Sequence, residues 1–267
     1  MERCLVVGVL NCTPDSFSDG GRFETVRGAI EAGLAMAEAG AAWVDIGGES
    51  TRPRSVPVSP DEEQRRILPV ISELSRALAG RVTLSVDTYH AATARAAVEA
   101  GARIINDVSG GSIEPALLSI AAEAGVGLVL GHLRGRPATM MEAIEFQDVV
   151  GEVSRELLER IDSARSRGCT DVWVDPGIGF GKRLEHNVAL LQDLPVIRRA
   201  VGVPLMVGVS RKAFIGELTG RPPGERVFGT AAAVTAAVLG GASAVRVHDV
   251  AAMVDVVRVA ETLRKST

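Results

Sequence analysis

The sequence predicts an α/β fold built as one (β/α)8 barrel, the TIM barrel, over residues 1–267. Eight short apolar runs rich in valine and isoleucine recur along the chain, and alanine-rich segments with helical spacing lie between them. Continuous apolar strands that alternate with helices are typical of a parallel sheet whose outer face is covered. A doubly wound open sheet is the structural alternative.

The predicted elements follow from these runs in chain order. The eight predicted strands are residues 5–10, 42–46, 82–86, 102–106, 126–130, 171–174, 204–209 and 243–247. Segments 25–40 and 62–80 have helical spacing, and several helical segments end in a glycine that suits a helix C-cap. Since no linker, charge run or low-complexity segment divides the chain, we expect a single domain.

Composition narrows the classes of partner. The chain is 46% hydrophobic and 23% charged with a net charge of −4, which argues against disorder and against a nucleic-acid-binding surface. No apolar segment approaches the roughly 18 residues that span a bilayer. Cys4, Cys12 and Cys169 lack metal-ligand spacing. We therefore expect a soluble, cytoplasmic protein that binds a small molecule.

Polar residues follow each predicted strand, where a barrel of this class builds its site. These residues are Asn11, Thr51 and Arg52 within "GGESTRPRS", Asp87, Asn106 with Asp107, His132, Asp175, Ser210 with Arg211 and Lys212, and Arg246 with His248. One such residue alone is most often a turn former or a helix cap. Eight positions together favour a site at the mouth of the barrel.

Lysine is scarce in this chain. Three of the 29 basic residues are lysine, namely Lys182, Lys212 and Lys265, and the first two follow apolar runs. Because an ammonium and a guanidinium bind with different geometry, a chain that prefers arginine indicates a need for an ammonium where it keeps lysine. Asparagine is equally scarce, at Asn11, Asn106 and Asn187.

The residue types at the predicted mouth suit a diphosphate and a flat ring. Asn11 offers a neutral oxygen to a hard cation such as magnesium, which shares its shell with substrate phosphates. Arginine and histidine after the second and eighth strands could hold those phosphates. Asp87, Asn106 and Asp175 provide carboxylate and amide groups for the polar edge of a heterocycle, and both nucleobases and pterins fit.

Other chemistries fit less well. "GVSRKAFIG" lacks the second glycine of a nucleophile elbow, and "GIGFGK" matches neither a Walker A loop nor a Rossmann fingerprint. The four histidines lack zinc spacing, and His90 and His186 near helix starts are predicted to be surface residues. The pattern therefore predicts substitution at a carbon that bears a diphosphate leaving group, without a covalent intermediate.

At this point the motifs identify a family. "LNCTPDSFSDGG", "DIGGESTRP", "SVDT", "INDVSGG", "DPGIGFGK", "SRK" and "VRVHD" occur in the order found in dihydropteroate synthases, which the chain closely resembles over nearly its whole length. The resemblance implies a folate-pathway transferase that joins a dihydropterin diphosphate to para-aminobenzoate. It also implies a Mg²⁺ requirement, a homodimer, and competitive inhibition by sulfonamides as mimics of para-aminobenzoate.

The resemblance also implies a role for each matching residue. The catalytic residues would be Asn11, which also binds the metal, with Asp87, Asp175, Lys212 and Arg246. Phe17 would lie in one loop that closes over the site, and Thr51, Arg52 and Pro53 in a second. Asp87, Asn106, Asp175 and Lys212 would contact the pterin, with Arg246 stacked on its ring. Arg246, His248 and Asn11 would hold the diphosphate, and Phe180 and Ser210 would lie near para-aminobenzoate.

Two positions depart from the family pattern. Ala213 replaces a serine that helps to hold the para-aminobenzoate carboxylate in many relatives, so a different arylamine stays an alternative. Gly131 replaces a methionine that commonly packs on the pterin, which predicts a looser pocket. The alternative from another class is a pterin-binding module like those of corrinoid methyltransferase systems, for which the motifs "NCTPDSFSDGG" and "ESTRP" would be superfluous because its ligand lacks a diphosphate.

Overall fold

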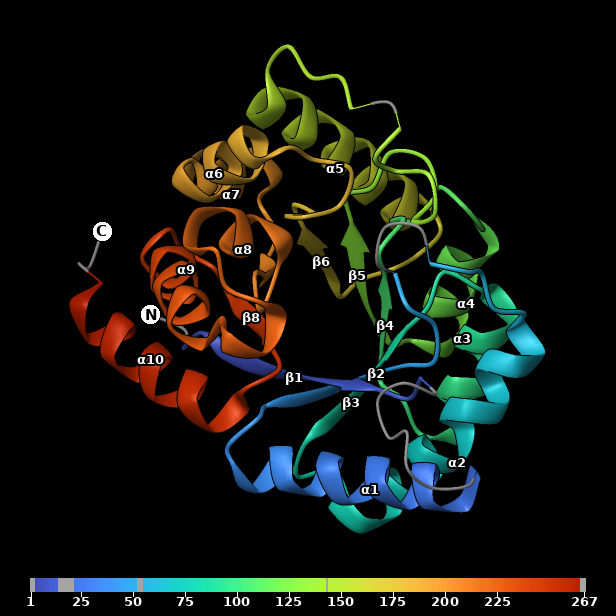
Figure 1. Cartoon of the computed structure of the whole chain (residues 1–267). Helices are drawn as coiled ribbons and strands as arrows, with labels where there is room; N and C mark the ends of the chain where they lie inside the picture. The colour runs from blue at the N-terminus through green and yellow to red at the C-terminus, as the bar shows by residue number, and fades with distance from the viewer. Residues whose placement is uncertain (1–2, 14–21, 52–54, 143, 265–267) are drawn as a thin grey trace.

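The computed structural model describes residues 3–13, 22–51, 55–142 and 144–264. Within these residues, eight parallel strands form one sheet at the centre of the molecule, and the helices surround it (Figure 1). The strands are β1 (Leu5–Asn11), β2 (Trp43–Gly47), β3 (Thr83–Asp87), β4 (Ile104–Asp107), β5 (Gly127–Gly131), β6 (Val172–Asp175), β7 (Met206–Gly208) and β8 (Ala244–Val247).

The helices connect successive strands and cover the outside of the sheet (Figure 1). They are α1 (Arg22–Glu38), α2 (Pro60–Leu78), α3 (Ala91–Ala100), α4 (Ala116–Ala124), α5 (Val149–Ser166), α6 (Leu184–Gln192), α7 (Leu194–Val201), α8 (Ala213–Thr219), the 3₁₀ turn η2 (Pro223–Glu225), α9 (Val227–Leu239) and α10 (Val250–Leu263).

The sheet closes into a barrel. Its strand order is β6-β5-β4-β3-β2-β1-β8-β7, so β1 pairs with both β2 and β8. A parallel bridge between Val174 of β6 and Leu205, just before β7, joins the two ends, and the Val174 amide donates to the Pro204 carbonyl over 3.0 Å. The predicted barrel is thereby confirmed, and the open-sheet alternative is excluded.

The predicted strand positions are confirmed, with small shifts at their ends. The third and sixth predicted strands each extend one residue further, to Asp87 and Asp175, because these polar residues still take part in the backbone ladder. The predicted strand 204–209 shortens to β7. Pro204 has no N–H to donate, and Leu205 forms an isolated bridge to Val174 outside the regular strand.

Glycine ends five of the described helices, as predicted; the cap of α9, Gly240, keeps a right-handed conformation with φ −73°. The C-cap residues of α3, α4, α7 and α8 are Gly101, Gly125, Gly202 and Gly220, and each has a positive φ. Helix α2 differs, because Ala79 takes the left-handed conformation with φ 46°. A side chain is uncommon there, since its Cβ crowds the backbone.

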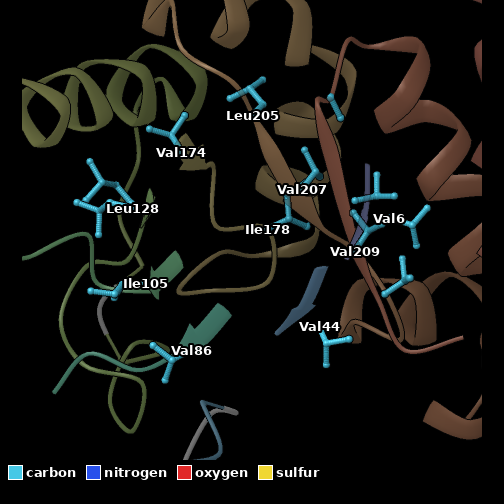
Figure 2. Packing of buried hydrophobic residues seen from close by; sticks show 14 of the residues in the cluster. Val6, Val44, Val86, Ile105, Leu128, Val174, Ile178, Leu205, Val207 and Val209 are labelled. Atoms are coloured by element: carbon cyan, nitrogen blue, oxygen red, sulfur yellow. The ribbon is translucent and has the colours of Figure 1, made fainter. Parts of the chain in front are cut away.

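The main hydrophobic core lies between the strands and the helices. Figure 2 shows Val44, Val86, Ile105, Leu128 and Val174, which come from five successive strands, β2 to β6. Each of these side chains is 0% exposed and belongs to one continuous cluster with residues of the surrounding helices. Burial of this cluster is the main force that holds the helices against the barrel.

The other side of each strand faces the barrel interior, where the side chains change from apolar to polar along the axis. The lower layer consists of Val7, Trp43, Ile104, Val129, Met206 and Ala244, with Trp173 packed against it. Because strand residues alternate between faces, the positions two residues further along point inward again. On β2, β4 and β8 these are Asp45, Asn106 and Arg246, which places a polar layer directly above the apolar one.

The three cysteines are free and buried. Burial raises the pKa of Cys4 and of Cys12 to about 12, so both stay thiols at neutral pH. Among the described residues, we find no helix with the length and apolarity required to cross a membrane.

Candidate functional site

A pocket opens at the carboxyl ends of the strands, where the sequence predicts the site. Six of the predicted site residues line it: Asp87, Asn106, Asp175, Phe180, Lys212 and Arg246. The rest of the lining comes from small or apolar positions, namely Val108, Gly131, Gly177 and Gly208. The barrel topology therefore brings together side chains that are up to 159 residues apart in the chain.

Arg246 forms the floor of this pocket together with two carboxylates. Its Nε donates to Asp45 Oδ2 and its Nη2 donates to Asp87 Oδ2, each over 2.6 Å. Burial favours the neutral guanidine, but Asp45 and Asp87 outweigh it and raise the pKa of Arg246. The guanidinium is thus a fixed, charged group at the base of the site.

Asp45 is the anchor of this arrangement, and its side chain is 1% exposed. Besides the bond from Arg246, Asp45 Oδ1 accepts from Ser85 Oγ over 2.6 Å, and Asp45 Oδ2 accepts from Asn106 Nδ2 over 2.9 Å. Three donors on a buried carboxylate satisfy most of its hydrogen-bonding capacity. Asp45 therefore fixes the orientation of both Arg246 and Asn106.

Two further carboxyl groups face the pocket. Burial raises the pKa of Asp87; Arg246 opposes the rise, and Asp45 adds to it. Burial also raises the pKa of Asp175, whose Oδ1 accepts the Gly177 amide over 2.7 Å. These groups offer hydrogen-bond acceptors to a ligand in a partly desolvated site, where such bonds are stronger than in water.

Lys212 supplies a hydrogen-bond donor to the pocket. Its Nζ lies 3.8 Å from the centroid of the Phe180 ring, a cation–π contact. Burial lowers the pKa of Lys212 to about 8, and Asp175 opposes this by favouring the charged form. Lys212 is therefore still largely protonated at pH 7.

A strained turn delivers Lys212 to the pocket. Arg211 has φ 58°, and its guanidinium binds both carboxylate oxygens of Asp249, over 3.1 and 2.5 Å. The Arg211 amide donates to Thr230 Oγ1 over 3.1 Å. Arg226 Nη1 donates to the carbonyls of Arg211 and Lys212 over 3.0 and 3.2 Å. These bonds hold a backbone conformation that a non-glycine residue rarely adopts.

Ser210 and His248 form a pair beside the pocket. Ser210 Oγ lies 3.0 Å from His248 Nδ1 and accepts the His248 amide over 3.2 Å. Burial, with help from Arg246 and Arg211, lowers the pKa of His248 to about 4. His248 is therefore neutral at pH 7, so it can offer a phosphate a hydrogen bond and not a full charge.

The remaining predicted residues lie apart from the pocket lining or outside the described residues. Asn11 ends β1 and is partly exposed, and its carboxamide makes no hydrogen bond to the residues that the structure describes. Thr51 is also partly exposed. Phe17, Arg52 and Pro53 lie outside the described residues.

Comparison with known proteins agrees with this geometry. The family model described as "Pterin binding enzyme" matches residues 7–248. The dihydropteroate synthase of Mycobacterium leprae is 48% identical over 95% of this chain and 91% of its own length. The dihydropteroate synthase of Synechocystis sp. is 44% identical over 98% of this chain and 91% of its own length. The chain belongs to the dihydropteroate synthase family.

Solved structures of dihydropteroate synthases share the fold. The Xanthomonas albilineans enzyme with 4-aminobenzoic acid has a TM-score of 0.91 at 46% identity, over 99% of this chain and 94% of that one. The same enzyme in complex with 7,8-dihydropteroate has a TM-score of 0.88 at 44% identity, over 99% and 95%. The Yersinia pestis enzyme in a sulfonamide drug complex has a TM-score of 0.91 at 39% identity, over 99% and 95%.

The two departures from the pattern of dihydropteroate synthases occupy different surroundings. A Cβ built on Gly131 would lie 2.7 Å from both the Cα and the carbonyl oxygen of Val108. The Val108 backbone therefore lies beside Gly131 in that direction, and the looser pocket stays a prediction. Ala213 is exposed at the first position of α8, next to Lys212.

The prediction of a surface position was wrong for His90, whereas His186 is partly exposed. The His90 side chain is 13% exposed; its Nδ1 lies 2.9 Å from Glu114 Oε1 and its Nε2 lies 3.4 Å from Glu49 Oε2. Tyr89 also donates to Glu49, over 2.5 Å. His186 is partly buried, and its ring packs edge-on against Phe146. The general preference for surface histidines at helix starts could not reveal acidic partners 24 and 41 residues away.

Sequence reasoning missed several residues that shape the site. Asp45 lies inside "AWVDI", a mostly apolar segment that predicts a strand, and a carboxylate within a buried strand is itself a signal. Arg226 lies just before α9 and Thr230 lies on it; they carry no local signal, because their partners are backbone groups of the turn at Arg211.

Replacing His90 with glutamine should alter the pH dependence of stability. The nearby carboxylate of Glu49, 3.4 Å from Nε2, raises the pKa of His90 from its ordinary value of 6.5 to about 9, and Glu114 adds to the rise. Because the folded pKa is the higher one, the charge stabilises the fold fully below pH 6.5, and this contribution is lost as the pH rises through about 9. The melting temperature of wild type minus that of His90→Gln should therefore shrink over this range, and a constant difference would contradict the assignment.

Proposed function

We propose that the chain condenses 6-hydroxymethyl-7,8-dihydropterin diphosphate with para-aminobenzoate to give 7,8-dihydropteroate and diphosphate. The observation that carries this proposal is the pocket in which Asp87, Asn106, Asp175 and Lys212 converge above the Arg246 guanidinium. The chain's membership of the dihydropteroate synthase family supports it, as do the family structures with 4-aminobenzoic acid and with 7,8-dihydropteroate.

The pocket suits the pterin ring because the ring has one polar edge and the pocket has polar side chains that can bind it. A pterin carries N–H donors beside a ring carbonyl and ring nitrogens, so it needs acceptors and donors that alternate in one plane. Asp87 and Asp175 supply acceptors, Lys212 supplies a donor, and Asn106 can supply either. Specificity follows because a site built from buried polar groups rejects a ligand that leaves them unpaired.

The proposed reaction breaks one bond and forms another at the same carbon. The C–O bond between the pterin methylene and the diphosphate breaks, and diphosphate leaves with the electron pair. The arylamine nitrogen supplies a pair to form the new C–N bond, and its proton passes to solvent. The chain contributes by orienting both substrates and by stabilising the charge that develops on the leaving group, with neutral His248 as a donor.

We also propose that Mg²⁺ neutralises the leaving diphosphate. The described residues contain no group of three or more His, Cys, Asp or Glu that could hold a metal ion. A site of this kind therefore fits a cation that keeps water and binds through the substrate phosphates. Asn11 fits as the protein ligand of the metal. It is the last residue of β1, and β1 pairs with β8, the strand that leads to His248.

A homodimer and a cytoplasmic location complete the proposal. Large apolar side chains are exposed on α8 and α9: Leu218 is 61% exposed, Phe228 86% and Leu239 46%. Such residues favour a protein interface. Light scattering should give twice the chain mass of 27.9 kDa, and a monomer at micromolar concentration would contradict the dimer.

Free, buried cysteines are typical of a reducing compartment, and localisation of a tagged chain would test the proposed cytoplasmic location.

The proposal is tested by measuring diphosphate release from the dihydropterin diphosphate with and without para-aminobenzoate, while mass spectrometry follows the pterin. We expect release coupled to 7,8-dihydropteroate. Lys212→Ala should lower kcat/KM by about 10²- to 10³-fold, because it removes a partly buried donor from the site. Arg221→Ala, at an exposed ion pair, should leave it unchanged. Release without dihydropteroate would point to another arylamine, and no release would favour a pterin-binding module.

Asn11→Ala should raise the Mg²⁺ concentration needed for half-maximal rate, because it removes the proposed protein oxygen from the metal. The measurement is a metal titration of initial rate at saturating substrates. Arg221→Ala, at an exposed ion pair, provides the control. An unchanged titration for Asn11→Ala would remove this residue from the metal site.

A further inference from the structure

Lys182 is a buried lysine that the reaction described above does not use. Its side chain follows the "DPGIGFG" segment after β6, and the residue is 3% exposed. Its Nζ lies 3.0 Å from His132 Nδ1, 3.1 Å from the Phe180 carbonyl oxygen and 3.5 Å from the His132 carbonyl oxygen. These three acceptors match the three N–H donors of an ammonium.

His132 is held so that it can accept this bond. It is 0% exposed, and its Nε2 lies 3.0 Å from Glu156 Oε2 of α5. Because Glu156 also binds Arg134, it is a carboxylate that accepts, and the proton of the neutral imidazole therefore lies on Nε2. Burial and the neighbouring Lys182 lower the pKa of His132 to about 3, which keeps Nδ1 free to accept.

The segment that Lys182 closes is shaped as one wall of the pocket. Gly177, Gly179 and Gly181 all have positive φ, and a Cβ on Gly177 would lie 2.0 Å from the His132 carbonyl oxygen. Asn187 Oδ1 accepts the Gly179 amide over 2.6 Å. The segment is thus pinned close to the β5–α5 connection, with no room for side chains at its turns.

Phe180 is the residue that this wall presents to the pocket. Its ring lies against Lys212 Nζ, and its carbonyl accepts from Lys182. A shift of the Phe180 backbone would therefore move the ring, while Lys212 stays held by the separate turn at Arg211. Lys182 itself does not line the pocket, and no contact between Lys182 and a substrate is predicted.

We propose that Lys182 is a positioning residue whose buried amine, oriented by His132 and Glu156, fixes Phe180 in the pocket wall and so sets the affinity for the arylamine substrate. This inference rests on the proposed function, in which Phe180 lies near para-aminobenzoate. It also explains why a chain with 29 basic residues keeps a lysine at this position. A planar guanidinium has a different donor geometry and cannot direct three bonds from one nitrogen.

The test compares Lys182→Met with Arg183→Met, which removes the adjacent exposed cation. For Lys182→Met we expect the KM for para-aminobenzoate to rise at least about tenfold, while the KM for the pterin diphosphate and kcat at saturation change less than about threefold. Lys182→Arg should not restore the KM. Arg183→Met should match wild type. An unchanged arylamine KM, or an equal rise in both KM values, would overturn the proposal.

Two further measurements keep the test decisive. Amide hydrogen exchange should be faster at Gly177, Gly179 and Phe180 in Lys182→Met and unchanged in Arg183→Met. If the wild-type chain forms no dihydropteroate, the proposed function fails, and unaltered exchange would then overturn the positioning role separately. If Lys182→Met does not fold, Phe180→Leu should raise the same KM without touching the buried amine, and an unchanged KM there would overturn the proposal.

Discussion

Arg246 brings a full positive charge into the interior of the barrel, and the surrounding side chains are arranged to neutralise it. Burying an ion is costly unless it is paired and hydrogen-bonded. Asp45 and Asp87 meet this requirement with bonds of 2.6 Å from two different nitrogens of the guanidinium. Ser85 and Asn106 then satisfy Asp45. The rest of the pocket is built on this set of bonds.

The barrel architecture makes the arrangement possible. Inward-facing positions two residues apart on each strand form successive layers, and the layer below the ion pairs is apolar, with Trp43 and Trp173 packed edge-on at 5.0 Å. The polar layer above it must therefore satisfy its charges within itself or through a ligand. The loops then add groups that the strands do not supply, namely the donor of Lys212 from the strained turn and the aromatic ring of Phe180 from the wall held by Lys182.

Much of the fold was predictable, because it depends on patterns that are local in the chain. Eight apolar runs separated by helical segments indicated the barrel, and polar residues after the runs indicated its mouth. The pairing partners were not predictable. Asp45 and Arg246 are separated by 201 residues, and Lys182 and His132 by 50. No spacing rule connects such residues, so the scarcity of lysine marked Lys182 as unusual without revealing what it binds.

The central claim is that Asp45 acts through Arg246, and a double-mutant cycle on pterin affinity tests it most directly. Calorimetry with 6-hydroxymethylpterin would compare wild type, Asp45→Asn, Arg246→Met and the double variant. Each single variant should weaken binding at least about tenfold, and the double should be no more than about threefold weaker than Arg246→Met alone, because coupled residues are not additive. If the two losses instead multiply, Asp45 and Arg246 act independently, and the account of the pocket floor is wrong.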